Sequence, residues 1–169
     1  MSTATGSTRG AQGPIVFAYD GSELAKLAIG EAARQLGPGR AALVLTVWHP
    51  FDVGFAPAGN VRFDAAQISD VKEAAEDTAA EGASLAQAAG FEARSAVAEA
   101  APTWKGIVDT AEEQDSSLIV LGSHGRTGLA GVLMGSVAEA VAAHSRRSVL
   151  IAHRPGSPDD HSAHTTTDR

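Results

Sequence analysis

The sequence predicts an α/β fold in which helices cover both faces of a parallel sheet. Short apolar runs alternate with helical patterns along the chain, in the order β-α-β-α-β-α-β-α-β. Such alternation implies right-handed crossovers between parallel strands. Residues 41–48, AALVLTVW, are apolar on both faces, as a strand between two helical layers should be. Hydrophobic residues make up 44% of the chain and aromatic ones only 5%, which fits small side chains packed between helices and a sheet.

The first half of the chain contains two strands and two helices. Residues 14–20, PIVFAYD, are the first strand, and a helix follows at 22–37. After the strand at 41–48 comes a long loop, 49–63, interpreted either as a lid over a ligand or as a variable surface loop. The helix 65–90 comes next. Its apolar stripe is expected at spacings of three or four residues, through Ile68, Val71, Ala75, Thr78, Gly82, Leu85 and Ala89.

The second half continues the alternation. Residues 91–100 alternate between apolar and polar more than the other strands do, which predicts an edge strand. A shorter helix at 102–114 opens with proline, a good first-turn residue. The remaining elements are a strand at 117–122, a helix at 136–145 and a strand at 148–153.

Composition and charge exclude several classes of function. Thirteen basic and 20 acidic residues give a formal net charge of −7, which disfavours binding to DNA, RNA or an anionic membrane. The absence of cysteine excludes disulfides, thiolate metal sites and cysteine nucleophiles. No apolar stretch is long enough for a membrane span, and the first residues lack the apolar core of a signal peptide. A cytoplasmic location is therefore expected.

Both ends of the chain are expected to be disordered tails. Residues 1–13 are rich in Ser, Thr and Gly, and residues 154–169 are polar with two prolines. Neither segment has enough apolar surface to offset the entropy lost on ordering. The ordered domain is thus predicted to span residues 14–153.

A glycine-rich stretch follows the fourth predicted strand, in the pattern G-x2-G-x9-G-S. Gly122 and Gly125 leave the strand, and Gly135 and Ser136 open the next helix. Bare backbone N–H groups, together with a helix N-terminus, form a site for an anion such as a di- or triphosphate. The alternative is structural, because glycine loops also serve simply to turn the chain and a serine there can be only a cap.

A second polar signal, Asp20-Gly21-Ser22, follows the first predicted strand. Ligands of open parallel sheets bind at the carboxyl ends of strands, where the strand order reverses. In the order 3-2-1-4-5 the first and fourth strands are neighbours at that switch, so Asp20 and the glycine stretch would converge on one crevice. Asp20 is expected to accept hydrogen bonds from ribose hydroxyls, although it could also be only a turn residue.

The sequence argues against two enzyme classes. LGSHG resembles a G-x-S-x-G nucleophile elbow, but Leu121 stands where that motif needs glycine, so Ser123 and His124 are not expected to form a hydrolase site. No G-x4-G-K-[ST] motif occurs, and no lysine lies between residues 106 and 169. Without that lysine, rapid phosphoryl transfer lacks its usual charge clamp. No catalytic residue is assigned.

The stretch LIVLGSHGRTGLAGVLMGSVAEAV, with VFAYDGS near the start and SVLIAH at the end, resembles the universal stress protein family. The glycine spacing is that of the family members that bind ATP. The resemblance covers about residues 14–153, and implies one Rossmann-like domain of the adenine nucleotide alpha hydrolase type. Its sheet is five-stranded and parallel in the order 3-2-1-4-5, and the family is usually dimeric through the last strand, here residues 148–153.

The resemblance also implies which residues meet the nucleotide. Asp20 lies beside the ribose or adenine, Val47 meets the adenine through its backbone, and Gly122 lies by the ribose. Three further residues line that end of the pocket: Ala18, Tyr19 and Leu121. The phosphates are held by Gly125, Gly135, Ser136 and Val137, and flanked by His124 and Arg126. Magnesium or manganese is expected to bridge the phosphates, because the site has few cationic side chains to balance them, and no metal-ligating residue is assigned.

Two positions depart from the usual pattern. Tyr19 stands where a small or aliphatic residue is commoner, so its ring either narrows the pocket or points elsewhere. Ser148 stands where proline often precedes the last strand.

The function expected is that of an ATP-binding regulatory module in a stress response, with at most slow hydrolysis. Two alternatives remain: a dimeric interaction module that binds no nucleotide, and a slow nucleotide hydrolase. Another adenine compound could also be the ligand.

Overall fold

The computed structural model describes residues 13–50, 65–126 and 134–154 of the 169-residue chain. The strands are β1 (Ile15–Ala18), β2 (Ala41–Trp48), β3 (Glu92–Glu99), β4 (Leu118–Gly122) and β5 (Ser148–Ala152). The helices are α1 (Glu23–Leu36), α2 (Ala65–Ala88), α3 (Thr103–Glu113) and α4 (Ser136–His144). The predicted tails lie outside the described residues except for Gly13 and Arg154, as does the loop 49–63 except for His49 and Pro50.

The strands form a single parallel sheet in the order β3-β2-β1-β4-β5, which confirms the predicted fold. β1 is central and pairs with β2 on one side and β4 on the other. The strand predicted as an edge, β3, lies at one edge of the sheet and is partly exposed along its length. The order reverses between β1 and β4, so the switch point lies where the sequence analysis places it.

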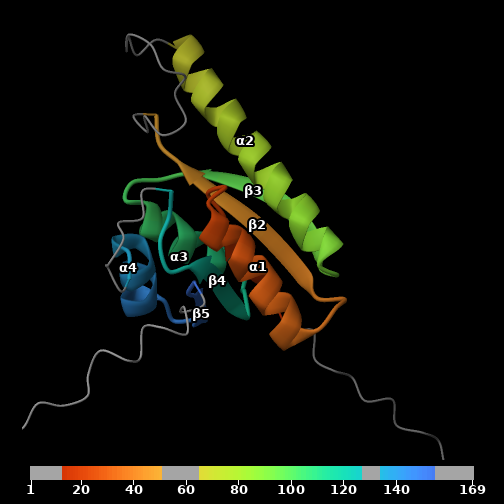
Figure 1. Ribbon diagram of the computed structural model, residues 1–169. Coiled ribbons are helices and arrows are strands. Elements are labelled where there is room, and N and C mark those ends of the chain that lie inside the picture. Colours follow the sequence, from red (N-terminus) through yellow and green to blue (C-terminus); the bar gives the residue numbers. More distant parts are fainter. Residues whose placement is uncertain (1–12, 51–64, 127–133, 155–169) are drawn as a thin grey trace, which may run out of the picture.

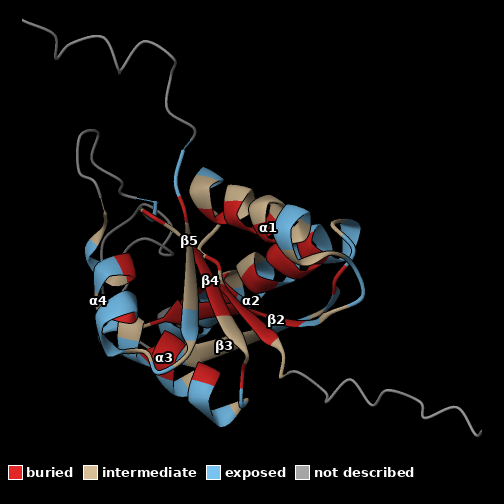
Figure 2. Cartoon of the chain, turned by 90° about the horizontal axis from the view of Figure 1, so that it is seen from below, coloured by how far each residue is buried: buried red, intermediate tan, exposed pale blue. Residues whose placement is uncertain are grey.

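Helices α1 and α2 cover one face of the sheet, and α3 and α4 cover the other (Figure 1). Phe17 of β1 and Val44 of β2 point into a core formed with α1 and α2. Val16 and Leu45, the neighbours of these residues, point into a second core formed with α3 and α4. Seen from below, buried residues fill the layers between strands and helices (Figure 2). The central strands β1 and β4 carry no polar side chain, because both of their faces are covered by helices.

The apolar stripe predicted for α2 is only partly correct. Ile68 and Leu85 are exposed, at 38% and 37%. The buried face instead follows Val71, Ala75, Ala79, Ala83 and Ala86. The reason is close packing at Gly82, where an added Cβ would lie 2.7 Å from the Tyr19 ring and 2.8 Å from Val44. This approach brings the alanines on either side of Gly82 onto the sheet and leaves the larger Leu85 at the rim.

Candidate functional site

The turn after β1 is held by hydrogen bonds from neighbouring elements. Tyr19 donates its N–H to Leu45 of β2 at 2.9 Å, and its carbonyl accepts from the Thr46 hydroxyl at 2.9 Å. The chain then reverses at Gly21, whose φ of +80° lies in the left-handed region that glycine adopts without strain. Ser22 caps α1 by accepting from the N–H of Ala25 at 3.2 Å. The turn is therefore anchored both to the sheet and to α1.

A hydrogen bond joins the first residues of the glycine loop after β4 to the residue that precedes α4. Ser123 donates its N–H to Ala152 of β5 at 2.8 Å, and its carbonyl accepts from the N–H of Gly135 at 2.7 Å. Gly135 is the N-cap of α4 and makes no side-chain capping bond. The first turn of α4, which starts at Ser136, therefore lies close to Ser123 at the start of the loop. Residues 127–133, in the middle of the loop, lie outside the described part of the chain.

Asp20 joins the turn after β1 to the loop after β4. Its carboxylate oxygen Oδ1 accepts from the N–H of Ser22 at 3.0 Å, and Oδ2 accepts from the N–H of Arg126 at 3.0 Å. Gly125 makes this approach possible, because an added Cβ there would lie 2.7 Å from Oδ2. We call this region, formed by residues 19–22, residues 122–126 and the start of α4, the switch-point site.

His124 lies between Gly122 and Gly125 in the sequence. Its Nδ1 is 3.2 Å from the Ser123 hydroxyl, and its Nε2 is buried without a hydrogen-bonding partner among the described residues. An added Cβ at Gly135 would lie 3.5 Å from the His124 Cα. Ser123 itself is only 2% exposed, so its hydroxyl is not presented to a substrate as a nucleophile must be.

The backbone of Val47 points toward the switch-point site. Leu45 accepts from Tyr19, so its backbone groups face β1, whereas Trp48 accepts from Ala100 and faces β3. Backbone groups of consecutive strand residues point to opposite sides. Val47 therefore shares the direction of Leu45, and its N–H and C=O face the β1 side of β2, past the last paired residue of β1. The adenine contact of Val47 stays a prediction.

Most of the predicted site residues fall into two groups. Asp20, Gly125 and Arg126 contact one another, and Gly135 packs against His124. The side chains of a second group instead pack in the two cores, which they share with the sheet and the helices: Ala18, Tyr19, Val47, Leu121 and Val137. Any ligand contact from this second group would have to come mainly from the backbone. Ser136 is exposed at the start of α4, and Gly122 is half-buried under α1.

The tyrosine ring points away from the loop. Tyr19 is 3% exposed and lies against Gly82 of α2, so of the two expectations the second is correct. Burial raises the pKa of its hydroxyl well above the ordinary value of a tyrosine, and the negative charge of Glu81 raises it further.

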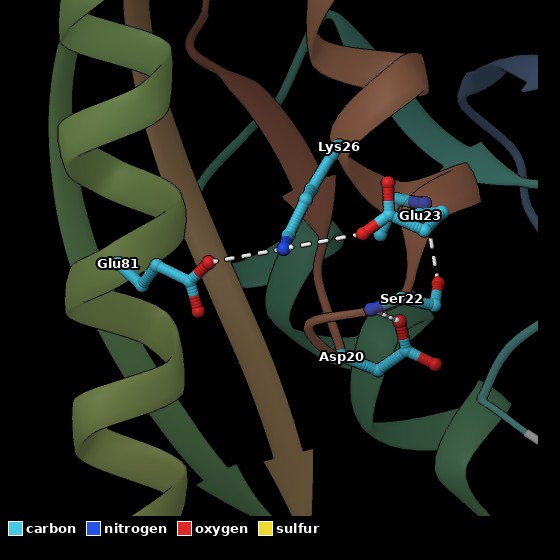
Figure 3. Close-up of polar contacts among 6 residues, drawn as sticks. Asp20, Ser22, Glu23, Lys26 and Glu81 are labelled. Atoms are coloured by element: carbon cyan, nitrogen blue, oxygen red, sulfur yellow. Dashed lines mark hydrogen bonds and ion pairs between the residues drawn. The ribbon is translucent and has the colours of Figure 1, made fainter.

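Sequence reasoning missed several polar contacts around the turn after β1. Lys26 bridges Glu23 on its own helix and Glu81 on α2, at 3.4 Å from each (Figure 3). Hydrogen bonding to Glu23, and then to Glu81, raises the pKa of Lys26. Thr46 carried a detectable signal, since it is the polar residue in the apolar run of β2. The pairing of Lys26 with Glu81 had no signal in the sequence, because the two residues meet only in the folded chain.

The described residues contain no group of three or more His, Cys, Asp or Glu side chains that could hold a metal ion. Among the described helices, none is both long and apolar enough to cross a membrane.

A parallel sheet in the order 3-2-1-4-5, with a glycine loop at its switch point, defines a Rossmann-like α/β domain. The universal stress protein family matches residues 13–153, and the chain belongs to this family.

Two curated relatives match over short segments. Universal stress protein MJ0577 of Methanocaldococcus jannaschii is 43% identical over 51 residues, which cover 30% of this chain and 32% of that protein. Universal stress protein MJ0531 of the same organism is 45% identical over 49 residues, 29% of each chain. Each alignment thus spans less than a third of the relative.

Solved structures match over nearly the whole chain. That of MJ0577 has a TM-score of 0.70 and 24% identity, covering 87% of this chain and 99% of that one, which supports the fold. A universal stress protein in complex with cAMP has a TM-score of 0.59 at 26% identity, covering 85% and 98%. A universal stress protein from Archaeoglobus fulgidus in complex with dAMP has a TM-score of 0.55 at 25% identity, covering 84% and 98%. These two relatives bind adenine nucleotides.

Proposed function

We propose that this chain binds ATP at the switch-point site and acts as a nucleotide-dependent regulatory module in a stress response. The observation that carries the proposal is the hydrogen bond between Asp20 and the N–H of Arg126. It joins two segments that lie 106 residues apart, and both segments carry residues that the family resemblance implies for the nucleotide. The relatives in complex with cAMP and dAMP support an adenine nucleotide as the ligand.

Each part of the nucleotide has a proposed partner. The backbone of Val47 meets the adenine, and the carboxylate of Asp20 accepts from the ribose. The phosphates lie against the glycine loop and the N-terminus of α4, where unpaired N–H groups and the helix dipole favour negative charge. Magnesium or manganese bridges the phosphates. The proposal includes a homodimer through β5 and a cytoplasmic location, both expected from the sequence.

Any hydrolysis of the nucleotide is expected to be slow. The sequence after residue 105 contains no lysine to neutralise charge in the transition state of phosphoryl transfer. Ser123 is buried, and no carboxylate is paired with His124 among the hydrogen bonds of the described residues. Binding rather than turnover is therefore the function that the site supports.

Calorimetry with ATP and magnesium tests the proposal, with Gly135→Val as the matched variant. At Gly135 the φ of −77° suits valine, but the new Cβ would lie 3.2 Å from the Ser123 carbonyl oxygen. The side chain would fill the place proposed for phosphate, so binding should be lost. Gly30→Val is the control, because the nearest atom to an added Cβ there is Nη1 of Arg34 at 4.0 Å.

The parent and Gly30→Val should bind ATP, and Gly135→Val should fold but not bind. Absence of binding in the folded, nucleotide-free parent would refute the proposal and leave the nucleotide-free interaction module. Competition by cAMP and dAMP identifies the preferred adenine compound. Turnover far above background, lost on changing His124 or Arg126, would instead establish a nucleotide hydrolase.

A further inference from the structure

The carboxylate of Asp20 occupies a position suited to a bound anion. Its Oδ2 accepts from the N–H of Arg126 in the glycine loop, and its Oδ1 accepts from the N–H of Ser22, the N-cap of α1. Figure 3 shows the carboxylate below the start of α1. Phosphate and carboxylate oxygens use the same donors, namely backbone N–H groups of loops and of helix N-termini.

The glycine loop is shaped around this carboxylate. Because an added Cβ at Gly125 would lie 2.7 Å from Oδ2, the missing side chain makes room for Asp20 itself. The N-terminus of α4 is close by, since Gly135 donates to Ser123 and packs against His124, the residue before Gly125. The internal anion and the proposed phosphate position thus share the same short stretch of loop.

We propose that Asp20 acts as an internal anion that excludes phosphate-only ligands from the switch-point site and so makes the site selective for nucleotides. A free polyphosphate that takes the N–H of Arg126 displaces Oδ2 from it, and any polyphosphate at the loop meets the negative charge of Asp20. A nucleotide meets the same charge, but its ribose hydroxyls donate to the carboxylate and offset the repulsion. Two carboxylate oxygens have lone pairs enough for such additional donors.

This inference rests on the proposed function, because it assigns the selectivity of the same site. It assigns Asp20 two opposite effects: a favourable one on the nucleoside part of a ligand and an unfavourable one on the phosphates. A residue that only binds ribose would have the first effect alone. The two roles, internal anion and simple ribose acceptor, therefore predict different effects of Asp20 on the affinity for a ligand that has no nucleoside.

The test compares tripolyphosphate, adenosine and ATP as ligands of the parent and of Asp20→Asn. Calorimetry is run without divalent cations, so that no metal ion bridges two anions. Asp20→Asn removes the charge and should strengthen tripolyphosphate binding about tenfold or more, the scale of one hydrogen bond to a charged group. Adenosine should bind more weakly. The ratio of ATP affinity to tripolyphosphate affinity should therefore fall.

Two further variants keep the test decisive. Asp20→Ser retains a hydroxyl that can accept from the N–H of residue 22, as serine does in such turns, but is too short to reach the loop. Asp20→Ser should therefore also strengthen tripolyphosphate binding. It takes the place of Asp20→Asn in the test if that variant does not fold. Glu23→Gln removes a neighbouring negative charge from a side chain that is 83% exposed and is paired with Lys26 of its own helix. It should leave tripolyphosphate binding close to that of the parent.

The outcomes separate the inference from the proposed function. Unchanged or weaker tripolyphosphate binding in folded Asp20→Asn and Asp20→Ser would overturn the inference, whatever ATP does. The same gain in Glu23→Gln would also overturn it, because the effect would then be one of overall charge. A gain confined to the Asp20 variants, in a protein that binds no ATP, would uphold the internal anion and refute ATP as the ligand.

Discussion

Tyr19 keeps its proton to a higher pH in the folded chain than in an unfolded one. Its side chain is 3% exposed, and its hydroxyl has no hydrogen-bonding partner among the described residues. Burial, and next to it the charge of Glu81, raises the pKa of this hydroxyl above the value of about 10 that it has in an unfolded chain. The unfolded state therefore loses this proton at a lower pH than the folded state does.

This difference predicts a loss of stability in alkali. Below about pH 10 the ionisation of Tyr19 does not change the free energy of unfolding, because the hydroxyl is protonated in both states. Above that pH the free energy of unfolding falls as the pH rises toward the raised pKa of the folded state. The slope is about 1.4 kcal/mol per pH unit. Urea unfolding of the parent and of Tyr19→Phe over this range is the measurement, and the difference between the two should change in favour of the variant as the pH rises.

The chain offers a direct check, because Tyr19 is its only tyrosine. Ultraviolet absorbance of tyrosinate should appear in the native protein only at a higher pH than in the urea-unfolded protein. Coincident titrations of the two states would contradict the assignment, as would parallel stability curves for parent and variant.

At the scale of elements, α1 packs on β4 through the absence of a side chain at Gly122. An added Cβ there would lie 2.8 Å from Cβ, 2.9 Å from the carbonyl carbon and 3.0 Å from the carbonyl oxygen of Leu24. Two of these atoms belong to the backbone of the first turn of α1, which Ser22 fixes as the N-cap. The first glycine of the G-x2-G-x9-G-S pattern therefore serves helix packing.

Gly122→Ala should destabilise the fold by about 1–3 kcal/mol, the usual cost of overpacking. Chemical denaturation measures the change. Gly30→Ala is the matched control: it lies within α1, and its added methyl would meet only the flexible Arg34 side chain, at 4.0 Å. It should stabilise the protein by roughly 0.5–1 kcal/mol, as alanine does in a helix. Equal stability of Gly122→Ala and the parent would mean that α1 moves away from β4 at no cost.

At the scale of the whole molecule, β5 is an edge strand of the sheet. Val149, Leu150 and Ile151 are half-buried, and no strand in the described chain pairs with the outer side of β5. Because Ala152 accepts from Ser123, the backbone groups of Val149 point outward. An apolar edge with free donors is the part of the sheet open to pairing with a second chain.

Val149→Pro should weaken the proposed homodimer through β5. Proline removes an outward-pointing N–H while leaving the hydrogen bonds to β4 in place, as edge strands tolerate. Sedimentation velocity over a range of concentrations should show a dimer for the parent and a shift toward monomer for the variant. Val149→Ala keeps the N–H and loses side-chain packing, so it should remain dimeric. A dimer of unchanged strength in Val149→Pro would place the interface elsewhere.

Much of the architecture follows from local patterns that a reader of the sequence can see. β2 was predicted at its observed bounds, because a run apolar on both faces is characteristic of a strand between two layers. β3 was predicted as an edge from its alternation. The convergence of Asp20 with Gly125 and Arg126 was also predictable, because parallel strands with a known order bring their carboxyl ends together.

The tertiary structure alone decided which partner each of those residues has. Asp20 contacts the glycine loop itself, Gly122 makes room for Leu24, and the Tyr19 ring lies against Gly82 instead of near a ligand. A periodic pattern reports which face of an element is apolar, but not how closely another element approaches it. Approach distance depends on side chains from segments far apart in sequence, so the carboxylate–loop contact and the exposed Leu85 of α2 emerge only when the chain is folded.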